Sequence, residues 1–147
     1  NRSYIKNKKK LLNVIKSFEE NKYFKIDSNP DSSESMNKSE ILITDWSGIS
    51  FEYMIQSKPI IFIDTPPKVN NKNYINSSNT PLEVSMRNEI GETINFNEIN
   101  SIDPEILGKK INNALSKISN NKKFIKNNFY NFGNSVTKIC NQIEKIK

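Results

Sequence analysis

The stretch that decides the fold runs from Ile41 to Ile63 and is written ILITDWSGISFEYMIQSKPIIFI. Residues 41–44 are apolar and largely β-branched, which predicts a strand. Residues 49–57 are mostly apolar and predict a helix packed on a sheet, ended by Lys58-Pro59. Residues 60–63 form a continuous apolar run, typical of a central strand buried on both faces. Short links between these elements favour parallel strands joined by right-handed crossovers.

The segment before this stretch extends the same alternation. Residues 1–22 predict a helix, because apolar residues recur at three- and four-residue spacing between lysines. Residues 23–27 predict a short strand that ends in a turn at 28–31. Residues 32–40 are polar and predict a short helix. The middle of the chain is therefore predicted to run strand, helix, strand, helix, strand.

The segment after it begins with a long polar loop at residues 64–80, and loops of this length tend to be functional or mobile. Residues 82–93 predict a short helix that ends at Gly91, and residues 94–96 predict a last short strand. The sequence thus indicates an α/β fold, with a Rossmann-like parallel sheet and helices on both faces.

The remaining residues predict helices. Asp103 is expected to cap a helix that has Pro104 at its first position. After a break at Asn120-Asn121 we expect one or two more helices. The last of them should carry Cys140 as a buried apolar residue.

The composition excludes several kinds of chemistry. The 147 residues contain no histidine and a single cysteine. A Ser-His-Asp triad, a histidine-ligated zinc and an internal disulfide are therefore impossible within this chain. The longest strongly apolar run, residues 59–63, is far shorter than the roughly 20 residues that a membrane span needs. One cysteine and no recognisable signal peptide predict a cytoplasmic location.

The basic charge favours a second class of function. The net charge is +6, which suits a non-catalytic module that binds nucleic acid or an anionic surface. However, Asn, Ile and Lys supply 66 of the 147 residues, a bias typical of an AT-rich genome, and no nucleic-acid motif is recognisable. A degenerate domain that serves only in assembly is a third possibility.

The residues with the clearest chemistry follow the first strand of the 41–63 stretch. Ligands bind at the carboxyl ends of parallel strands, and a helix N-terminus attracts phosphate. Ser47 and Ser50 offer hydroxyl groups, Gly48 lets an anion approach the backbone, and the Glu52 carboxylate suits ribose hydroxyls. The alternative is structural: Asp45 or Ser47 caps the helix and Gly48 forms a tight turn, with no ligand.

The 41–63 stretch resembles the signature of the CDP-glycerol glycerophosphotransferase family, whose members build teichoic-acid and related polyol-phosphate polymers. The upstream FKIDSNPDSSESMNKSE and the downstream FIDTPPKVNNKNY and PLEVSMRNEIG extend the likeness to roughly residues 20–95. The resemblance implies the C-terminal half of a GT-B fold, the half that binds the nucleotide donor.

By this resemblance Ser47, Gly48 and Ser50 face the diphosphate of CDP-glycerol or a related nucleotide diphosphate. Glu52 binds the ribose and Asp45 orders the loop. The chain departs from the commoner family pattern in having Ser-Gly where many members have Ser-Ser, and Glu52 where many have Asp. The spacing from Gly48 to Glu52 is shared with UDP-sugar GT-B glycosyltransferases and sugar 2-epimerases, so these donors stay open.

Other binding residues are also implied. Ser28 and Asn29 stand where the base edge would be bound. Arg87 either clamps a phosphate with both ends of its guanidinium or forms a surface ion pair with Glu83 or Glu89. Trp46 either stacks on a base or packs in the core. Three residues of the long loop either close over the diphosphate or are exposed residues placed there by the composition bias: Lys68, Lys72 and Tyr74.

The resemblance implies a transferase, and because the chain has no histidine we expect its general base to lie elsewhere. Because the chain begins with Asn1, we expect residues 1–147 to be one donor-binding domain of a longer protein. A missing N-terminal domain would supply the general base and bind a polymer or lipid-linked acceptor at the inner membrane face. No cofactor, metal or nucleic-acid partner is expected.

Overall fold

The structure is a computed structural model that describes residues 2–66 and 81–146. It contains two compact units, residues 1–37 and residues 38–147. The first unit contains α1 (Arg2–Phe18), and α2 (Ser33–Lys38) begins near its end. Both helices confirm the sequence prediction. The assignment of residues 1–147 to a single donor-binding domain stays a prediction.

The predicted strand at residues 23–27 is wrong. The backbone N–H of Tyr23 donates to Asn21 Oδ1 across 2.9 Å, and the N–H of Phe24 donates to the Asn21 carbonyl across 2.9 Å. These bonds turn the chain directly after α1. A strand needs a neighbouring strand to satisfy its backbone, and in the described part of the chain residues 23–27 pair with none. Two aromatic residues and one isoleucine in this segment do not supply such a partner.

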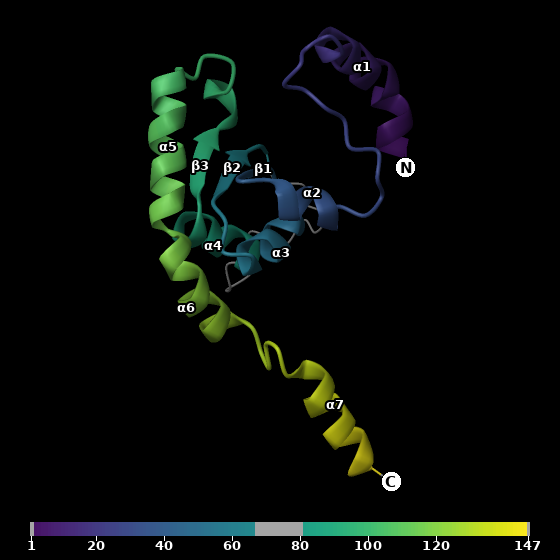
Figure 1. Ribbon diagram of the computed structural model, residues 1–147, viewed down its shortest axis with the longest axis vertical. Helices are drawn as coiled ribbons and strands as arrows, with labels where there is room; N and C mark the ends of the chain where they lie inside the picture. Colours follow the sequence, from purple (N-terminus) through teal and green to yellow (C-terminus); the bar gives the residue numbers. More distant parts are fainter. Residues whose placement is uncertain (1, 67–80, 147) are drawn as a thin grey trace. The chain divides into compact units, whose positions relative to one another are not determined.

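The second unit contains a three-stranded parallel sheet in the order β1-β2-β3 (Figure 1). Ile43 pairs with Ile61, and Ile63 pairs with Ile94. Within the described residues each crossover contains one helix, so the predicted alternation is confirmed from β1 onward. The elements are β1 (Leu42–Thr44), α3 (Ile49–Ile55), β2 (Ile60–Asp64), α4 (Leu82–Ile90) and β3 (Glu92–Asn95).

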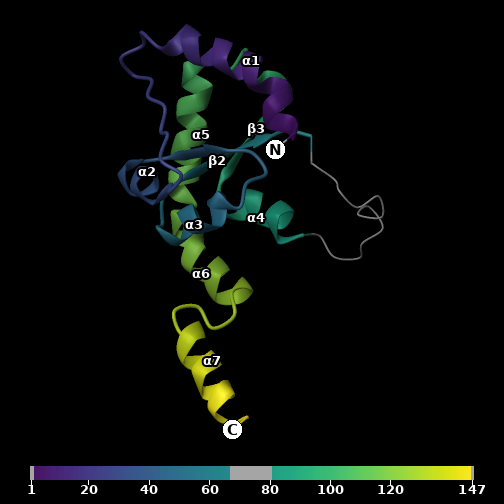
Figure 2. The same cartoon turned by 90° about the vertical axis from the view of Figure 1, so that its right-hand side faces the viewer.

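Helices cover both faces of this sheet, as predicted. On one face Ile61 and Ile94 form an apolar cluster with Ala114 of α5 (Pro104–Ser116), and α5 runs along the sheet in both views (Figures 1 and 2). Side chains alternate along a strand, so Ile60 and Phe62 point to the opposite face. The central strand β2 is buried over its first three residues.

The opposite face is covered by the crossover helices. α3 buries Tyr53 and Met54, and α4 buries Met86 and Ile90. α6 (Ile118–Asn128) packs against both helices and contributes the buried Phe124. Together with the cluster under α5, these contacts give a Rossmann-like α/β arrangement.

The predicted break at Asn120-Asn121 is wrong, because α6 continues through both residues. The interruption lies one turn earlier, at Lys117 between α5 and α6. Tertiary contacts hold the two asparagines in the helix. Asn121 is fully buried and donates from Nδ2 to the Met54 carbonyl across 3.2 Å, while Asn120 Nδ2 donates to the Glu89 carbonyl across 3.2 Å.

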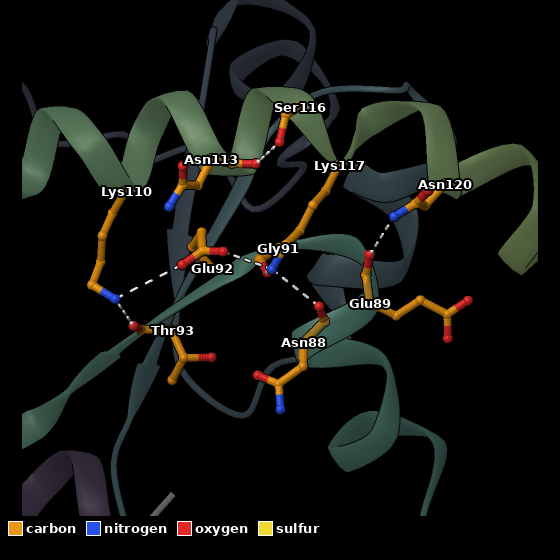
Figure 3. Close-up of polar contacts among 10 residues, drawn as sticks. All are labelled: Asn88, Glu89, Gly91, Glu92, Thr93, Lys110, Asn113, Ser116, Lys117 and Asn120. Carbon is orange, nitrogen blue, oxygen red and sulfur yellow. Dashed lines mark hydrogen bonds and ion pairs between the residues drawn. The ribbon is translucent and has the colours of Figure 1, made fainter.

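Lys117 fastens the α5–α6 junction to the end of α4 (Figure 3). Its Nζ donates to the carbonyls of Asn88 (3.1 Å) and Gly91 (2.8 Å) and lies 2.6 Å from Glu92 Oε1. Lys110 Nζ lies 3.8 Å from Glu92 Oε2. A cation at a helix C-terminus complements the helix dipole. These two lysines therefore serve the fold, which weakens the argument from net charge to an anionic partner.

Two predicted helix ends are confirmed. Asp103 Oδ1 accepts the backbone N–H of Glu105 across 2.6 Å, and Pro104 is the first residue of α5. Gly91 ends α4, where the chain passes close to β2. A Cβ built on Gly91 would lie 2.6 Å from the Ile60 carbonyl oxygen and 2.7 Å from the Phe62 ring, so only glycine fits without a shift.

The last predicted helix is confirmed as α7 (Ser135–Glu144), but none of its residues is buried. Val136, Ile139 and Ile143 are 75%, 59% and 54% exposed. Cys140 is exposed, so the expectation of a buried apolar cysteine is wrong. Among the described residues, no helix combines the length and apolar character needed to cross a membrane.

Candidate functional site

The loop Asp45–Gly48 leaves the carboxyl end of β1 and opens α3. The backbone N–H of Ser50 donates to the Ser47 carbonyl (3.3 Å), and that of Phe51 donates to the Gly48 carbonyl (3.0 Å). Gly48 is the N-cap residue, and no side chain caps the helix. The alternative in which Asp45 or Ser47 caps α3 is therefore wrong. The N–H groups of Ser50 and Phe51, in the first turn of α3, are thus already paired with carbonyls of the loop and of its last residue.

Gly48 is not required by the fold around it. Its φ of −61° and ψ of −19° are open to any residue. A Cβ added there would meet nothing within 4 Å among the described atoms. Gly91 differs from Gly48 in this respect, because the close packing at residue 91 leaves no room for a Cβ. Gly48 therefore leaves its backbone open to an approaching group.

The two serines of the loop have different surroundings. Ser47 is exposed, whereas Ser50 is 2% exposed and donates its hydroxyl to the Ser47 carbonyl across 2.8 Å. Ser50 thus holds the turn in shape, and Ser47 presents its hydroxyl to solvent. A contact between Ser50 and a diphosphate stays a prediction.

Arg87 anchors this loop from α4. It is 5% exposed, and it donates from Nη1 to the Asp45 carbonyl (3.2 Å) and from Nη2 to the Ile63 carbonyl (2.9 Å). Its acidic partner is Asp64, at 3.8 Å. The alternative of a surface ion pair with Glu83 or Glu89 is therefore wrong, and a contact of Arg87 with a phosphate stays a prediction. Burial lowers the pKa of the Arg87 guanidinium, while the carboxylates of Asp64 and Asp45 oppose this shift.

Two aromatic rings complete the anchor. The Arg87 guanidinium carbon lies 4.1 Å from the ring centroid of Trp46 and 4.7 Å from that of Phe62, distances typical of cation–π contacts. Trp46 Nε1 donates to the Thr65 carbonyl across 2.6 Å. The structure supports the packing alternative for Trp46 over base stacking. Through these bonds the loops that follow β1 and β2 are held together.

A hollow of about 10 Å³, room for about one water molecule, lies beside this anchor. Of the residues predicted to bind the donor, four line it together: Asp45, Ser47, Ser50 and Arg87. Phe62 and Glu83 also line the hollow. The sequence did not indicate Phe62 as a site residue, and it indicated Glu83 only as an ion-pair partner of Arg87. The spacing of Glu83 and Arg87 by one helical turn was the available signal.

Glu52 lies on α3, is exposed and does not line this hollow. Its contact with a ribose stays a prediction. The proposed roles of Lys68, Lys72 and Tyr74 fall outside the described residues. Within the described part of the chain, no group of three or more His, Cys, Asp or Glu residues is placed to hold a metal ion.

Ser28 and Asn29 belong to the first unit, in the segment that precedes α2. Asn29 accepts the N–H of Asp31 on Oδ1 across 3.0 Å and donates its own N–H to Asp27 Oδ1 across 2.8 Å. Ser35 Oγ donates to the second carboxylate oxygen of Asp27. Hydrogen bonds from Ser35 and then Asn29 lower the pKa of Asp27. Asn29 thus has a structural role, and base recognition by either residue stays a prediction.

Residues 5–80 match the family described as CDP-Glycerol:Poly(glycerophosphate) glycerophosphotransferase. The matched segment covers just over half of the 147 residues and includes β1, the Asp45–Gly48 loop, α3 and β2. The chain belongs to this family of transferases. Comparison with curated proteins and with solved structures gives no match.

Proposed function

We propose that this chain is the donor-binding half of a CDP-glycerol glycerophosphotransferase-like enzyme, built on the C-terminal half of a GT-B fold. Membership of the family supports the class of reaction. The site supports the donor-binding role, because the Asp45–Gly48 loop stands at the carboxyl edge of a parallel sheet, where such folds bind ligands.

One observation carries the proposal. The loop combines an exposed serine hydroxyl at Ser47 with a glycine at Gly48 that the surrounding fold does not need. The buried Arg87 fixes this loop through the Asp45 carbonyl. A rigid loop with an open backbone and a hydroxyl donor is suited to hold the oxygens of a diphosphate.

The proposed reaction transfers a polyol phosphate. An acceptor hydroxyl oxygen attacks the distal phosphorus of the CDP-activated donor, the bond from that phosphorus to the bridging oxygen breaks, and CMP leaves. The hydroxyl proton passes to a general base, which we assign to no residue of this chain. The loop would hold the diphosphate and stabilise the charge that develops on the departing nucleotide phosphate.

The remaining parts of the proposal concern the whole protein. The acceptor, a cell-surface polymer or a lipid-linked precursor, would bind an N-terminal domain outside this sequence. The enzyme would act in the cytoplasm at the inner membrane face. By itself the chain is expected to bind nucleotide weakly and to catalyse no transfer.

Isothermal titration with CDP-glycerol, CDP and UDP tests the donor site. We expect binding of the two cytidine nucleotides and about tenfold weaker binding by Ser47→Ala, equivalent to about 1.4 kcal/mol. Ser119→Ala, an exposed serine on α6, is the matched control and should bind normally. Preference for UDP would favour a sugar-nucleotide donor. No binding of any nucleotide would contradict the proposal.

A further inference from the structure

A second hollow lies at the same edge of the sheet, between the carboxyl ends of β2 and β3. Its volume is about 210 Å³. It is formed by the residues that end β2 and the residues that end β3 and begin the short helix η2 (Phe96–Glu98): Asp64, Thr65, Pro66, Asn95, Phe96 and Asn97. None of these residues was assigned a role from the sequence.

The lining of this hollow is uncharged except for one carboxylate. Asp64 is 54% exposed and accepts hydrogen bonds only, whereas the amide side chains of Asn95 and Asn97 can both donate and accept. Phe96 is 48% exposed and adds an apolar ring surface. Among the described lining residues there is no lysine or arginine, so the hollow is poorly suited to a phosphate group.

This combination suits a polyhydroxylated group. Hydroxyl groups donate to the carboxylate and exchange hydrogen bonds with the amides, and the C–H surface of a polyol or sugar can pack on the Phe96 ring. Asn95 Oδ1 already accepts the backbone N–H of Asn97 across 3.0 Å, which holds the two amides on one rigid turn.

The second hollow is joined to the Asp45–Gly48 site by two direct contacts. Asp64, which lines the second hollow, lies 3.8 Å from Arg87, which lines the first. Thr65 accepts the indole N–H of Trp46 across 2.6 Å, and these two residues also line different hollows. The two hollows are therefore neighbours on either side of the β2 end.

We infer that the second hollow binds the polyol or sugar portion of the donor whose diphosphate is held at Ser47 and Gly48. The inference rests on the proposed function and deepens it, since it assigns the part of the site that selects the transferred group. Phe96 and Asn97 then determine which transferred group is bound. The Asp64 carboxylate accepts a hydrogen bond from a hydroxyl group of the nucleotide donor and remains the acidic partner of Arg87.

The test compares each donor with its bare nucleotide by titration calorimetry: CDP-glycerol against CDP, and UDP-glucose against UDP. The variants are Phe96→Ala and Asn97→Ala. Asn97→Ala keeps the backbone N–H that Asn95 accepts, so the turn is retained. Asn100→Ala is the matched control, because Asn100 is exposed in the same segment and does not line the hollow. Urea unfolding of each variant verifies the fold.

We expect the wild-type chain to bind one donor more tightly than its bare nucleotide. Phe96→Ala and Asn97→Ala should each weaken the binding of that donor by about three- to tenfold, the scale of one lost hydrogen bond or ring contact. Neither should change the affinity for the bare nucleotide. Asn100→Ala should change neither. If both variants leave the donor unchanged, or weaken donor and nucleotide equally, the inference is wrong although the donor site stands. If the wild-type chain binds no nucleotide, the proposed function fails and this inference with it.

Discussion

Arg87 donates a hydrogen bond from Nη1 to the carbonyl oxygen of Asp45 across 3.2 Å, and this bond ties α4 to the loop that follows β1. The same guanidinium reaches the Ile63 carbonyl at the end of β2. The two loops that shape the candidate site are thus held by one buried side chain. The position of Ser47 and Gly48 then depends on a helix about forty residues further along the chain.

Replacement of Arg87 should therefore cost more than a surface substitution. Arg87→Met removes two charge-assisted hydrogen bonds, and we expect the free energy of unfolding to fall by about 2–4 kcal/mol. Arg87→Lys keeps the charge but lacks the forked geometry, so it should recover only part of this loss. Urea denaturation measures both variants. Unfolding midpoints equal to that of the wild type would show that the anchor contributes nothing to stability.

The glycines at residues 91 and 108 provide a matched pair. Gly91→Ala places a Cβ 2.6 Å from the Ile60 carbonyl oxygen and should destabilise the chain by about 1–3 kcal/mol. Gly108 lies inside α5 with nothing within 4 Å of an added Cβ, so Gly108→Ala should stabilise it by about 0.5–1 kcal/mol. Thermal unfolding compares the two. Equal changes of the unfolding temperature, with the same sign, would contradict the close approach at Gly91.

Lys117 and Lys109 allow the contribution of a half-buried ion pair to stability to be compared with that of an exposed one. Lys117→Met removes the contact with Glu92 and the bonds to the Asn88 and Gly91 carbonyls, and should cost about 1–3 kcal/mol. Lys109→Met removes only the exposed pair with Glu105, at 3.0 Å, and should cost about 0.5 kcal/mol or less. Denaturant titration provides both values, and the ranking would be refuted by a larger loss at Lys109.

The turn before α2 should respond to acid. The Ser35 hydroxyl and then the Asn29 N–H lower the pKa of Asp27 below its ordinary 3.8. A carboxyl whose pKa falls on folding stabilises the folded turn above the unfolded pKa, and this contribution is lost as the pH drops through the folded value. The turn should therefore loosen only below about pH 3.8.

NMR titration of the Asp27 carboxyl measures this effect. Ser35→Ala should move its midpoint up toward 3.8, because the largest cause of the shift is removed. Ser33→Ala is the control, since Ser33 lowers the pKa of Asp31 instead and should leave Asp27 unchanged. A wild-type midpoint at or above 3.8 would disprove the hydrogen-bonded turn.

Local signals allowed most of the central fold to be predicted. The apolar run at residues 60–63 identified the buried central strand, and Pro104 after Asp103 marked the start of α5. Both features are encoded within a few neighbouring residues. The strand predicted at 23–27 failed because a strand depends on a partner that sequence pattern alone does not supply.

The candidate site was predictable in its location but not in its internal roles. The order of elements predicted a site at the carboxyl end of β1. By contrast, the different roles of the exposed Ser47 and the buried Ser50 depend on side-chain packing. Likewise, Arg87 could be singled out as a rare arginine, but its partners lie 24 and 42 residues away in sequence. Such long-range contacts carry no signature in the local pattern.

Amide chemical-shift mapping of the chain with CDP tests the central claim most directly, because it reports where the nucleotide binds. The account predicts that the largest shifts fall on Ser47, Gly48 and Ser50, with smaller shifts at Arg87 and none along α7. Shifts that are absent at saturating CDP, or that gather away from the Asp45–Gly48 loop, would contradict the assignment of this loop as the donor site.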